Sequence, residues 1–500
     1  MGQTWAPWRK HLTFATACYC AYRFGCNLFT VLTATLAALS VVFLSNYITV
    51  SISPILGLVA AKFQASITEA GWLITVNLLF LGLGNLFWIP LSEKIGKRPV
   101  LVITSGLFFV STVWAALAKS YGSLLGARIV QGFAASVSEG IGPVIVGDLY
   151  FLHERGLWIG LNLLLFTVGT SLGSVFSGLI ATADADPKWI WWHQAILTGS
   201  LFLTMLLFHA ETNFSRPSEN ESGEGLPASQ LAGIRASVKS SWLSSLSFTS
   251  WYNRYARAFT PRMLAIEKLI WHRELSIWRL LWRPFLTLQF PAVLYCILSY
   301  GVCLGWTSFQ ITAQGALFPT IYGFSPLAVG NISCSYLVAS VLGCFAGGPF
   351  TDWTVDFITK RRGGYFVPEF RLWCMIPPAV MAPIGLMLWG AGLQNHLPSM
   401  VPIVGAAITY AILCSVPGIT MTYVVDCYRP VSKETMTIIT AAKNTFAFGL
   451  SFAVFPWIAR DGLIKVSGYQ VLIECIILLL TIPMYIYGSR LRVWTDRFMI

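Results

Sequence analysis

The polar stretch Pro90-Leu91-Ser92-Glu93-Lys94-Ile95-Gly96-Lys97-Arg98-Pro99 interrupts an otherwise apolar part of the sequence. An altered copy follows in the second half of the chain, with Pro349-Phe350-Thr351-Asp352 and then the basic run Lys360-Arg361-Arg362. In each copy an acid follows Pro, an apolar residue and Ser or Thr, and a basic cluster with Gly comes later. Such a stretch is typical of a turn between two membrane helices, because basic residues gather in cytoplasmic loops and Gly permits a tight reversal. The repetition indicates two related halves.

The composition of the 500-residue chain is that of a polytopic membrane protein. Hydrophobic residues make up 56% of it and charged residues 11%, whereas soluble domains carry about 25% charged residues. The net charge of +12 comes mostly from loops on one side, as the positive-inside rule expects. We therefore expect a lipid bilayer and no nucleic acid as partner. The 11 Cys lie mainly in apolar segments without metal-ligand spacing, so no metal and no cofactor is expected.

Twelve apolar segments are long enough to cross about 30 Å of hydrocarbon. They lie near residues 40–61, 70–90, 99–119, 123–148, 157–182, 189–209, 285–313, 326–350, 371–392, 399–427, 434–459 and 468–489. The sequence therefore predicts an all-α polytopic membrane protein with twelve transmembrane helices. These form two six-helix pseudo-symmetric bundles, 40–210 and 285–490, followed by a cytoplasmic tail, 491–500.

Two regions depart from this pattern. Residues 211–284 are predicted to be a cytoplasmic linker, flexible in its Ser-rich first part, with an interfacial helix at 266–283 on the inner membrane surface. Residues 1–39 form an N-terminal apolar extension. It is either an interfacial, re-entrant or long-helix segment, or the product of an intron retained in the gene model around 22–39.

The distribution of Lys and Arg predicts that both termini are cytoplasmic in a multi-pass protein of a cell membrane. In this topology most basic loop residues fall inside, and the outward-facing ones are Lys62, Lys119, Lys188, Arg460 and Lys465.

The two halves also share a sequence at the ends of their fourth segments. Val146-Gly147-Asp148-Leu149-Tyr150 in the first half is matched by Val424-Val425-Asp426-Cys427-Tyr428 in the second. Duplicated halves are what a rocking-bundle transporter requires. We expect the acids of the two turns to make cytoplasmic contacts that hold the outward-facing state, with Arg98 and the basic run 360–362 nearby. The residues predicted for this conformational latch are Glu93, Lys94, Gly96, Lys97, Arg98, Asp148, Asp352 and Asp426.

The first turn resembles the loop signature of the major facilitator superfamily. Glu93 stands for the usual Asp, Lys94 for the Arg and Gly96 for the Gly, whereas Ile89 replaces the leading Gly. Arg128-Ile129-Val130-Gln131-Gly132 is similar to the fourth-helix signature of the fungal drug:proton-antiporter branch. Together with inner loops at 151–156 and 368–372, the resemblance covers most of residues 40–490. It implies the twelve-span major facilitator fold and exchange of a substrate for protons.

Gly169, Gly173 and Gly178 in the fifth segment fit part of the antiporter motif of this branch. Ser174 stands where Pro is usual and Ser177 where Gly is usual, so export is less supported than the fold. Close helix packing alone also explains small residues at this spacing.

Three ionisable residues within the segments are candidates for proton coupling: Glu139, Arg128 and Lys443. A lone charge near the midplane costs at least about 2.5–3.5 kcal/mol. We therefore expect Glu139 and Lys443 to meet across the halves in one state, with two independently satisfied polar groups as the alternative. Arg128 either snorkels to the outer surface or influences the protonation of a nearby carboxylate.

In the fold implied by the resemblance, the first, second, seventh and eighth segments approach a central cavity. The candidate cavity residues on them are Asn46, Asn77, Gln289, Gln310, Trp306 and Asn331. The polar ones could instead bond a neighbouring helix.

The predicted function is that of a monomeric secondary transporter, not an enzyme. It would move a small organic molecule, a drug or secondary metabolite, outward by proton-coupled alternating access. No Walker loop occurs, so ATP hydrolysis is not the energy source. No nucleophile motif or His-rich cluster points to an enzyme. The alternatives are proton-coupled uptake of a polyamine or other organic cation, and a nutrient sensor that transports nothing.

Overall fold

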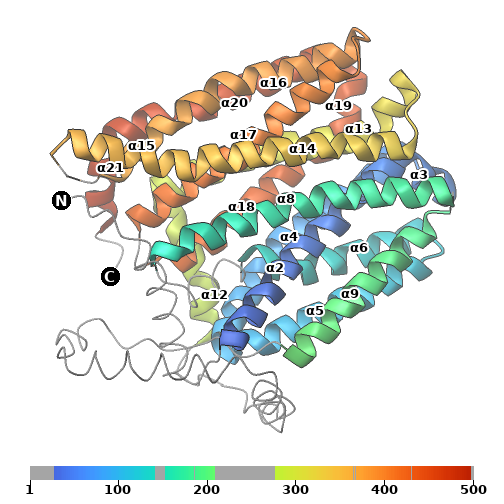
Figure 1. Cartoon of the computed structure of the whole chain (residues 1–500), viewed down its shortest axis with the longest axis horizontal. Helices are drawn as coiled ribbons and strands as arrows, with labels where there is room; N and C mark the ends of the chain where they lie inside the picture. Colours follow the sequence, from blue (N-terminus) through green and yellow to red (C-terminus); the bar gives the residue numbers. More distant parts are fainter. Residues whose placement is uncertain are drawn as a thin grey trace, which may run out of the picture.

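The computed structural model describes residues 28–140, 152–184, 186–208, 276–363, 365, 367–428 and 431–496. In this part of the chain all regular elements are helices. Figure 1 shows long helices lying alongside one another, with the first half in blue to green on one side and most of the second half in yellow to red on the other. The all-α prediction is confirmed for the described residues.

The first half begins earlier than the sequence predicts. Helix α2 starts at Leu28 and not near residue 40, because the apolar run before Ser40 continues into it without a break. Residues 28–39 are therefore helical, residues 1–27 lie outside the described part, and the origin of the extension stays a prediction. The helices of this half are α2 (Leu28–Val50), η1 (Ser53–Ile55), α3 (Leu56–Phe63), α4 (Ile67–Ile95), α5 (Lys97–Leu117), α6 (Tyr121–Ala135), α8 (Leu152–Ala183) and α9 (Lys188–Phe208).

The second half differs from the prediction at its polar ends, where helices replace expected loops. The second copy of the turn forms a separate helix that ends at Arg361, and the last helix runs to Asp496 through the predicted tail. The elements of this half are α12 (Ile277–Leu286), η3 (Thr287–Gln289), α13 (Pro291–Tyr322), α14 (Pro326–Gly347), α15 (Pro349–Arg361), η4 (Pro368–Met375), α16 (Ile376–Gln394), α17 (Met400–Cys427), α18 (Ser432–Phe452), α19 (Val454–Asp461), α20 (Leu463–Leu479) and α21 (Thr481–Asp496).

The number of spans is consistent with twelve. In the described residues, ten helical segments are long and apolar enough to cross a membrane, and α18 with α19, bent by 42°, makes an eleventh. The remaining predicted span corresponds to α6, which has 15 residues and is followed by residues 141–151 outside the described part.

The described end of the linker is the amphipathic helix α12. It carries Trp278 and Trp282 with exposed fractions of 78% and 66%, next to Arg279 and Arg283. Exposed Trp beside Arg is typical of a helix that lies in the membrane interface. The predicted interfacial helix at 266–283 overlaps α12 at 277–283, its place on the inner membrane surface stays a prediction, and residues 209–275 lie outside the described part.

The two halves contact each other through equivalent helices. Helix α4, the second span of the first half, packs along α18, the fifth span of the second half. Likewise α8, the fifth span of the first half, packs along α14, the second span of the second half. The second span of each half thus packs on the fifth span of the other, which agrees with the predicted pseudo-symmetry.

Glycines permit the close approach of α8 to its neighbours. A Cβ atom on Gly169 or Gly173 would lie 2.3 or 2.2 Å from a backbone oxygen of α2, so these residues pack the first half against itself. A Cβ atom on Gly178 would lie 2.6 Å from Pro326 O, and one on Gly330 would lie 2.6 Å from Ser174 O, both across the halves. Helix packing therefore accounts for all three motif glycines.

Candidate functional site

An ion pair joins the two halves inside the bundle. Glu139, which follows α6, lies with Oε2 3.1 Å from the Lys443 ammonium of α18. The same oxygen accepts a hydrogen bond of 2.8 Å from Asn444 Nδ2. Lys443 also donates to the Tyr300 hydroxyl at 3.3 Å, and its Nζ lies 4.4 Å from the centre of that ring. The predicted contact between Glu139 and Lys443 is confirmed, and Tyr300 and Asn444 are additional partners.

Burial makes this pair sensitive to the loss of either charge. The exposed fractions of the Lys443 and Glu139 side chains are 3% and 7%. Removing one partner of a buried pair leaves an uncompensated charge and typically costs about 3–5 kcal/mol. Glu139 lies where the chain packs closely on α4, because a Cβ atom on the neighbouring Gly140 would lie 2.5 Å from Asn85 Oδ1. The pair is therefore a charge-sensitive contact between two well-packed units.

Arg128 of α6 is wholly buried and binds the helices of the first half together. Its guanidinium donates to the backbone oxygens of Leu73, Ile48 and Thr49 at 3.1, 3.2 and 3.0 Å. It also donates to Gln131 Oε1 at 2.7 Å. Its exposed fraction is 0%, so the snorkelling alternative is wrong. No described carboxylate forms an ion pair with it, so an influence on a carboxylate stays a prediction.

The hydrogen bonds of Arg128 continue through neighbouring amides and hydroxyls. Gln131 donates to Thr112 Oγ1 at 2.8 Å, and Asn77 donates to Arg128 O at 2.9 Å while accepting from Thr49 Oγ1 at 2.8 Å. This network links α2, α4, α5 and α6. Asn77, a candidate for the substrate cavity, therefore bonds helices within the first half.

We expect Arg128→Lys to lower the melting temperature of the purified protein by several degrees and to reduce transport. Lysine has three donors on one nitrogen and cannot replace the planar fork, and each buried oxygen left unpaired costs about 1–3 kcal/mol. Arg460→Lys is the matched control, because the Arg460 side chain is 85% exposed. A melting temperature of Arg128→Lys equal to that of the control would contradict this structural role.

The predicted latch residues that the structure describes lie at one end of the bundle, called here the motif end. Glu93 of α4 contacts Lys433 of α18 across the halves, with 3.9 Å between Oε1 and Nζ. Asp352 of α15 pairs with Arg371 at 2.7 Å, and Arg371 also binds Asp426 of α17 at 2.7 Å. Asp352 therefore contacts Arg371 of its own half, and its expected contact across the halves stays a prediction.

The other described latch residues lie at the turn between α4 and α5. Gly96 ends α4 with a φ of 97°, a conformation that favours glycine, and so allows the tight reversal predicted for the turn. Lys94, Lys97 and Arg98 lie beside it on α4 and α5. Asp148 lies outside the described residues.

Glu93→Gln should shift the protein toward the state in which the motif end is open, by no more than about fivefold. An exposed ion pair contributes about 0–1 kcal/mol, and the Lys433 side chain is 55% exposed. The population is measured by the labelling rate of a cysteine introduced at Thr435, which is buried on α18 beside Lys433. Asp352→Asn is the control, because its partner Arg371 belongs to the same half. An equal shift in both variants would show that both turns act across the halves.

The family model described as Major Facilitator Superfamily matches residues 35–456. The chain belongs to the major facilitator superfamily. It is therefore a multi-pass membrane transporter of a small molecule and not an enzyme. The resemblance of its turn and fourth helix to this superfamily is confirmed.

Relatives of this major facilitator transporter occur in several fungi. It is 28% identical to an uncharacterized MFS-type transporter of Schizosaccharomyces pombe, over 84% of this chain and 78% of that protein. It is 24% identical to Protein HOL1 of Saccharomyces cerevisiae, over 84% and 80%. A probable efflux pump, mfs2, of Aspergillus flavus is 29% identical, over 83% and 91%.

Solved transporters share its fold. The crystal structure of a D-xylose-proton symporter matches 90% of this chain and 97% of that chain, with a TM-score of 0.62 and 16% identity. The xylose transporter XylE from E. coli, in a partially occluded inward-open conformation, matches 92% and 99%, with a TM-score of 0.58 and 16% identity. At this identity the likeness shows the fold alone.

The other cavity candidates of this superfamily member are dispersed. Asn46 and Gln310 are buried and donate to residues of their own halves. Trp306 has an exposed fraction of 0% and packs in the core of the second half. Gln289 and Asn331 are exposed. A cavity role for these residues stays a prediction.

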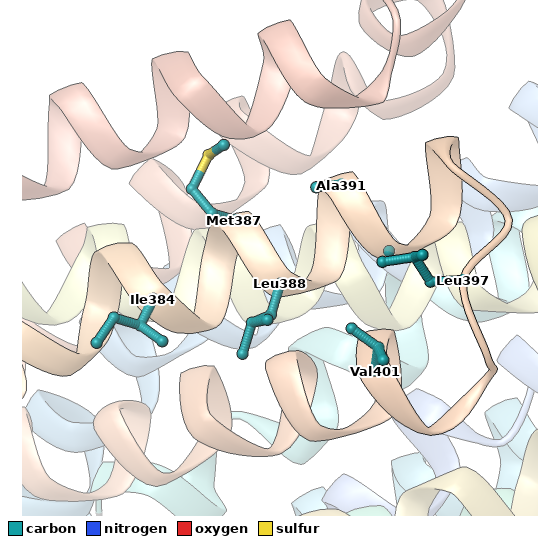
Figure 2. Close-up of a pocket in the computed structure, with 7 residues that line it drawn as sticks. Ile384, Met387, Leu388, Ala391, Leu397 and Val401 are labelled. Carbon is teal, nitrogen blue, oxygen red and sulfur yellow. The ribbon is translucent and has the colours of Figure 1, made fainter.

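Two apolar hollows lie in the described part of the structure, one within the second half and one between the halves. Figure 2 shows the smaller one, about 280 Å³, where Leu388 of α16 lies near Val401 and the lining extends to Ile384 and Leu397. It lies within the second half and offers no polar side chain. The other, about 620 Å³, lies between the halves and is lined mainly by apolar residues of α4, α12, η3, α13 and α18, with Thr445 among them. Its lining contains neither Glu139 nor Lys443.

Proposed function

We propose that this transporter couples the movement of a small organic molecule to protons through Glu139 and Lys443. The observation that carries the proposal is the buried contact of one carboxylate and one ammonium from opposite halves, 3.1 Å apart. Alternating access requires the halves to rock against each other. A contact between Glu139 and α18 is therefore broken and remade in each transport cycle.

The chemistry of the pair supplies the coupling. While Lys443 faces Glu139, the ammonium favours the ionised carboxylate. Separation removes the opposite charge and leaves the carboxylate poorly solvated, which favours the protonated acid. The hydrogen bond from Asn444 directs Glu139 Oε2 toward α18, and Tyr300 holds the ammonium on the other side. Rocking would thus bind a proton in one state and release it when the pair forms again.

The direction proposed is efflux of a drug or secondary metabolite from the cell by a monomer with both termini cytoplasmic. Two observations support it. One relative is named a probable efflux pump, and the hollow of about 620 Å³ between the halves is lined mainly by apolar side chains. Apolar pockets of this size accommodate drug-sized organic molecules.

Metabolites retained by cells with and without the gene identify a compound to follow. Inside-out vesicles should then accumulate that compound when a proton gradient is imposed, and a protonophore should abolish the accumulation. Accumulation by intact cells and not by inside-out vesicles would instead indicate uptake, which is the alternative prediction for a polyamine or other organic cation. Flux that persists unchanged with the protonophore would refute proton coupling, and a sensor would move nothing.

A further inference from the structure

A group of buried polar side chains lies within the second half, apart from the Glu139–Lys443 pair. Ser467, Gln470 and Glu474 of α20 have exposed fractions of 0%, 0% and 1%. Spacings of three and four residues place them on one face of the helix. This face packs against α16 and α13. A Cβ atom on Gly390 of α16 would overlap Ser467 Oγ, which shows how closely that helix approaches.

Polar atoms of this group lack partners among the described residues. Glu474 Oε2, both side-chain polar atoms of Gln470 and Ser467 Oγ form no hydrogen bond there. The other carboxylate oxygen, Glu474 Oε1, accepts from Cys303 Sγ of α13 at 3.6 Å. A buried amide or hydroxyl without a partner costs about 1–3 kcal/mol. Four such atoms on one helix face therefore indicate a bound species that satisfies them.

The charges around Glu474 do not include a basic partner. Helix α16 has no ionisable side chain, and α13 presents the Cys303 thiol. The ammonium of Lys443 is engaged by Glu139 and Tyr300. Helices α19 and α21 are the two remaining neighbours of α20. Arg460 of α19 pairs with Asp461. Helix α21 carries Tyr485, Tyr487, Arg490, Arg492 and Asp496, of which Arg492 pairs with Glu369.

An ionised carboxylate at this place would be uncompensated. Burying a lone charge is so costly that the group changes its protonation state instead. A protonated acid, in contrast, carries a hydroxyl that needs an acceptor, and Gln470 lies one helical turn away with a free amide. One turn spans about 5.4 Å, which is the separation that a single water molecule bridges. Buried water typically makes about three hydrogen bonds, and this helix face offers enough partners.

We propose that Glu474, Gln470 and Ser467 form a second proton-binding site, in which Glu474 is a neutral acid joined to Gln470 through bound water. The site differs from the Glu139–Lys443 pair because it lies within one half and contains no cation. It gives the transporter a buried proton whose surroundings do not depend on contact between the halves.

Infrared spectroscopy of the purified protein at neutral pH tests this site without any substrate. The wild type should show the carbonyl stretching band of a protonated carboxylic acid. Glu474→Gln should lose that band, while Glu139→Gln should keep it. Cys303→Ala should keep the band and shift it to higher frequency, because Glu474 Oε1 loses its hydrogen bond. Gln470→Leu should also shift it.

An unchanged band in Glu474→Gln, or its absence from the wild type, would overturn the proposal. Loss of the band in Glu139→Gln would assign the proton to the pair between the halves instead. If Glu474→Gln yields too little folded protein, the shift in Cys303→Ala decides the matter, since that variant removes one weak hydrogen bond. None of these readouts depends on flux, so failure of the proposed transport function would leave this result interpretable.

Discussion

Lys443→Met should abolish proton-driven flux and lower the stability of the purified protein. The substitution leaves the Glu139 carboxylate buried, with Asn444 as its remaining donor among the described residues. An unpaired buried charge of this kind costs about 3–5 kcal/mol unless the acid takes up a proton. In either case Glu139 no longer binds and releases a proton as the contact between the halves opens and closes. Flux in vesicles and thermal unfolding in detergent measure the two consequences.

Glu139→Gln and the double variant complete a double-mutant cycle with Lys443→Met. Glu139→Gln should also abolish proton-driven flux, because the amide cannot titrate. The double variant should recover folding or downhill exchange better than Lys443→Met alone, since no unpaired carboxylate remains. Lys465→Met, which replaces an exposed lysine of α20 in the same half, is the control for loss of a lysine. Strictly additive effects in the cycle would show that the pair does not act as a unit.

The sequence predicted the Glu139–Lys443 contact because charge and depth are both readable from it. Two opposite charges near the midplane of opposite halves have few alternatives in an apolar bundle. The turn at Glu93 and the fourth-helix signature likewise predicted the family, since they carry specific residue types at fixed spacing. These features depend on the order of residues along single helices.

Features that depend on three-dimensional packing were not accessible in this way. Arg128 was open to two interpretations because sequence cannot tell whether its helix face meets lipid or three backbone oxygens. Trp306 was a candidate for the cavity wall, and the sequence could not show that it packs in a cluster with Leu386 and Ile477 of its own half. The sequence did not pair Arg371 with Asp352. It predicted a loop between these residues and gave no sign that η4 returns to α15.

Substitutions of two glycines of α8 should have different effects. One should change the stability of the first half, and the other should change the balance between conformations. Gly173 packs on α2 within the first half, where a Cβ atom would lie 2.2 Å from Tyr47 O. Gly178 packs across the halves, where a Cβ atom would lie 2.6 Å from Pro326 O. Alanine is more favourable than glycine in a helix by about 1 kcal/mol. Any loss in Gly→Ala variants therefore comes from the clash.

Gly173→Ala should lower the melting temperature and the yield, because both conformations keep α2 packed on α8. Gly178→Ala should leave the melting temperature nearly unchanged and shift the protein toward the state that is open at the end away from Glu93. Overpacking costs about 1–3 kcal/mol, which corresponds to a population shift of about fivefold to 150-fold. Gly468→Ala is the control, since a Cβ atom there would meet nothing within 4 Å.

A cysteine at Thr312 reports the opening at that end. Thr312 is buried where α13 meets Gly71 of the first half, and its hydroxyl has no partner among the described residues, so Thr312→Cys removes no hydrogen bond seen there. The exposed Cys334 is replaced by Ser in the same background. Labelling of the cysteine at 312 should be about tenfold faster with Gly178→Ala and unchanged with Gly468→Ala. Equal destabilisation by Gly173→Ala and Gly178→Ala, with no change in labelling, would mean that the α8–α14 contact is a permanent part of the fold and not one that opens during transport.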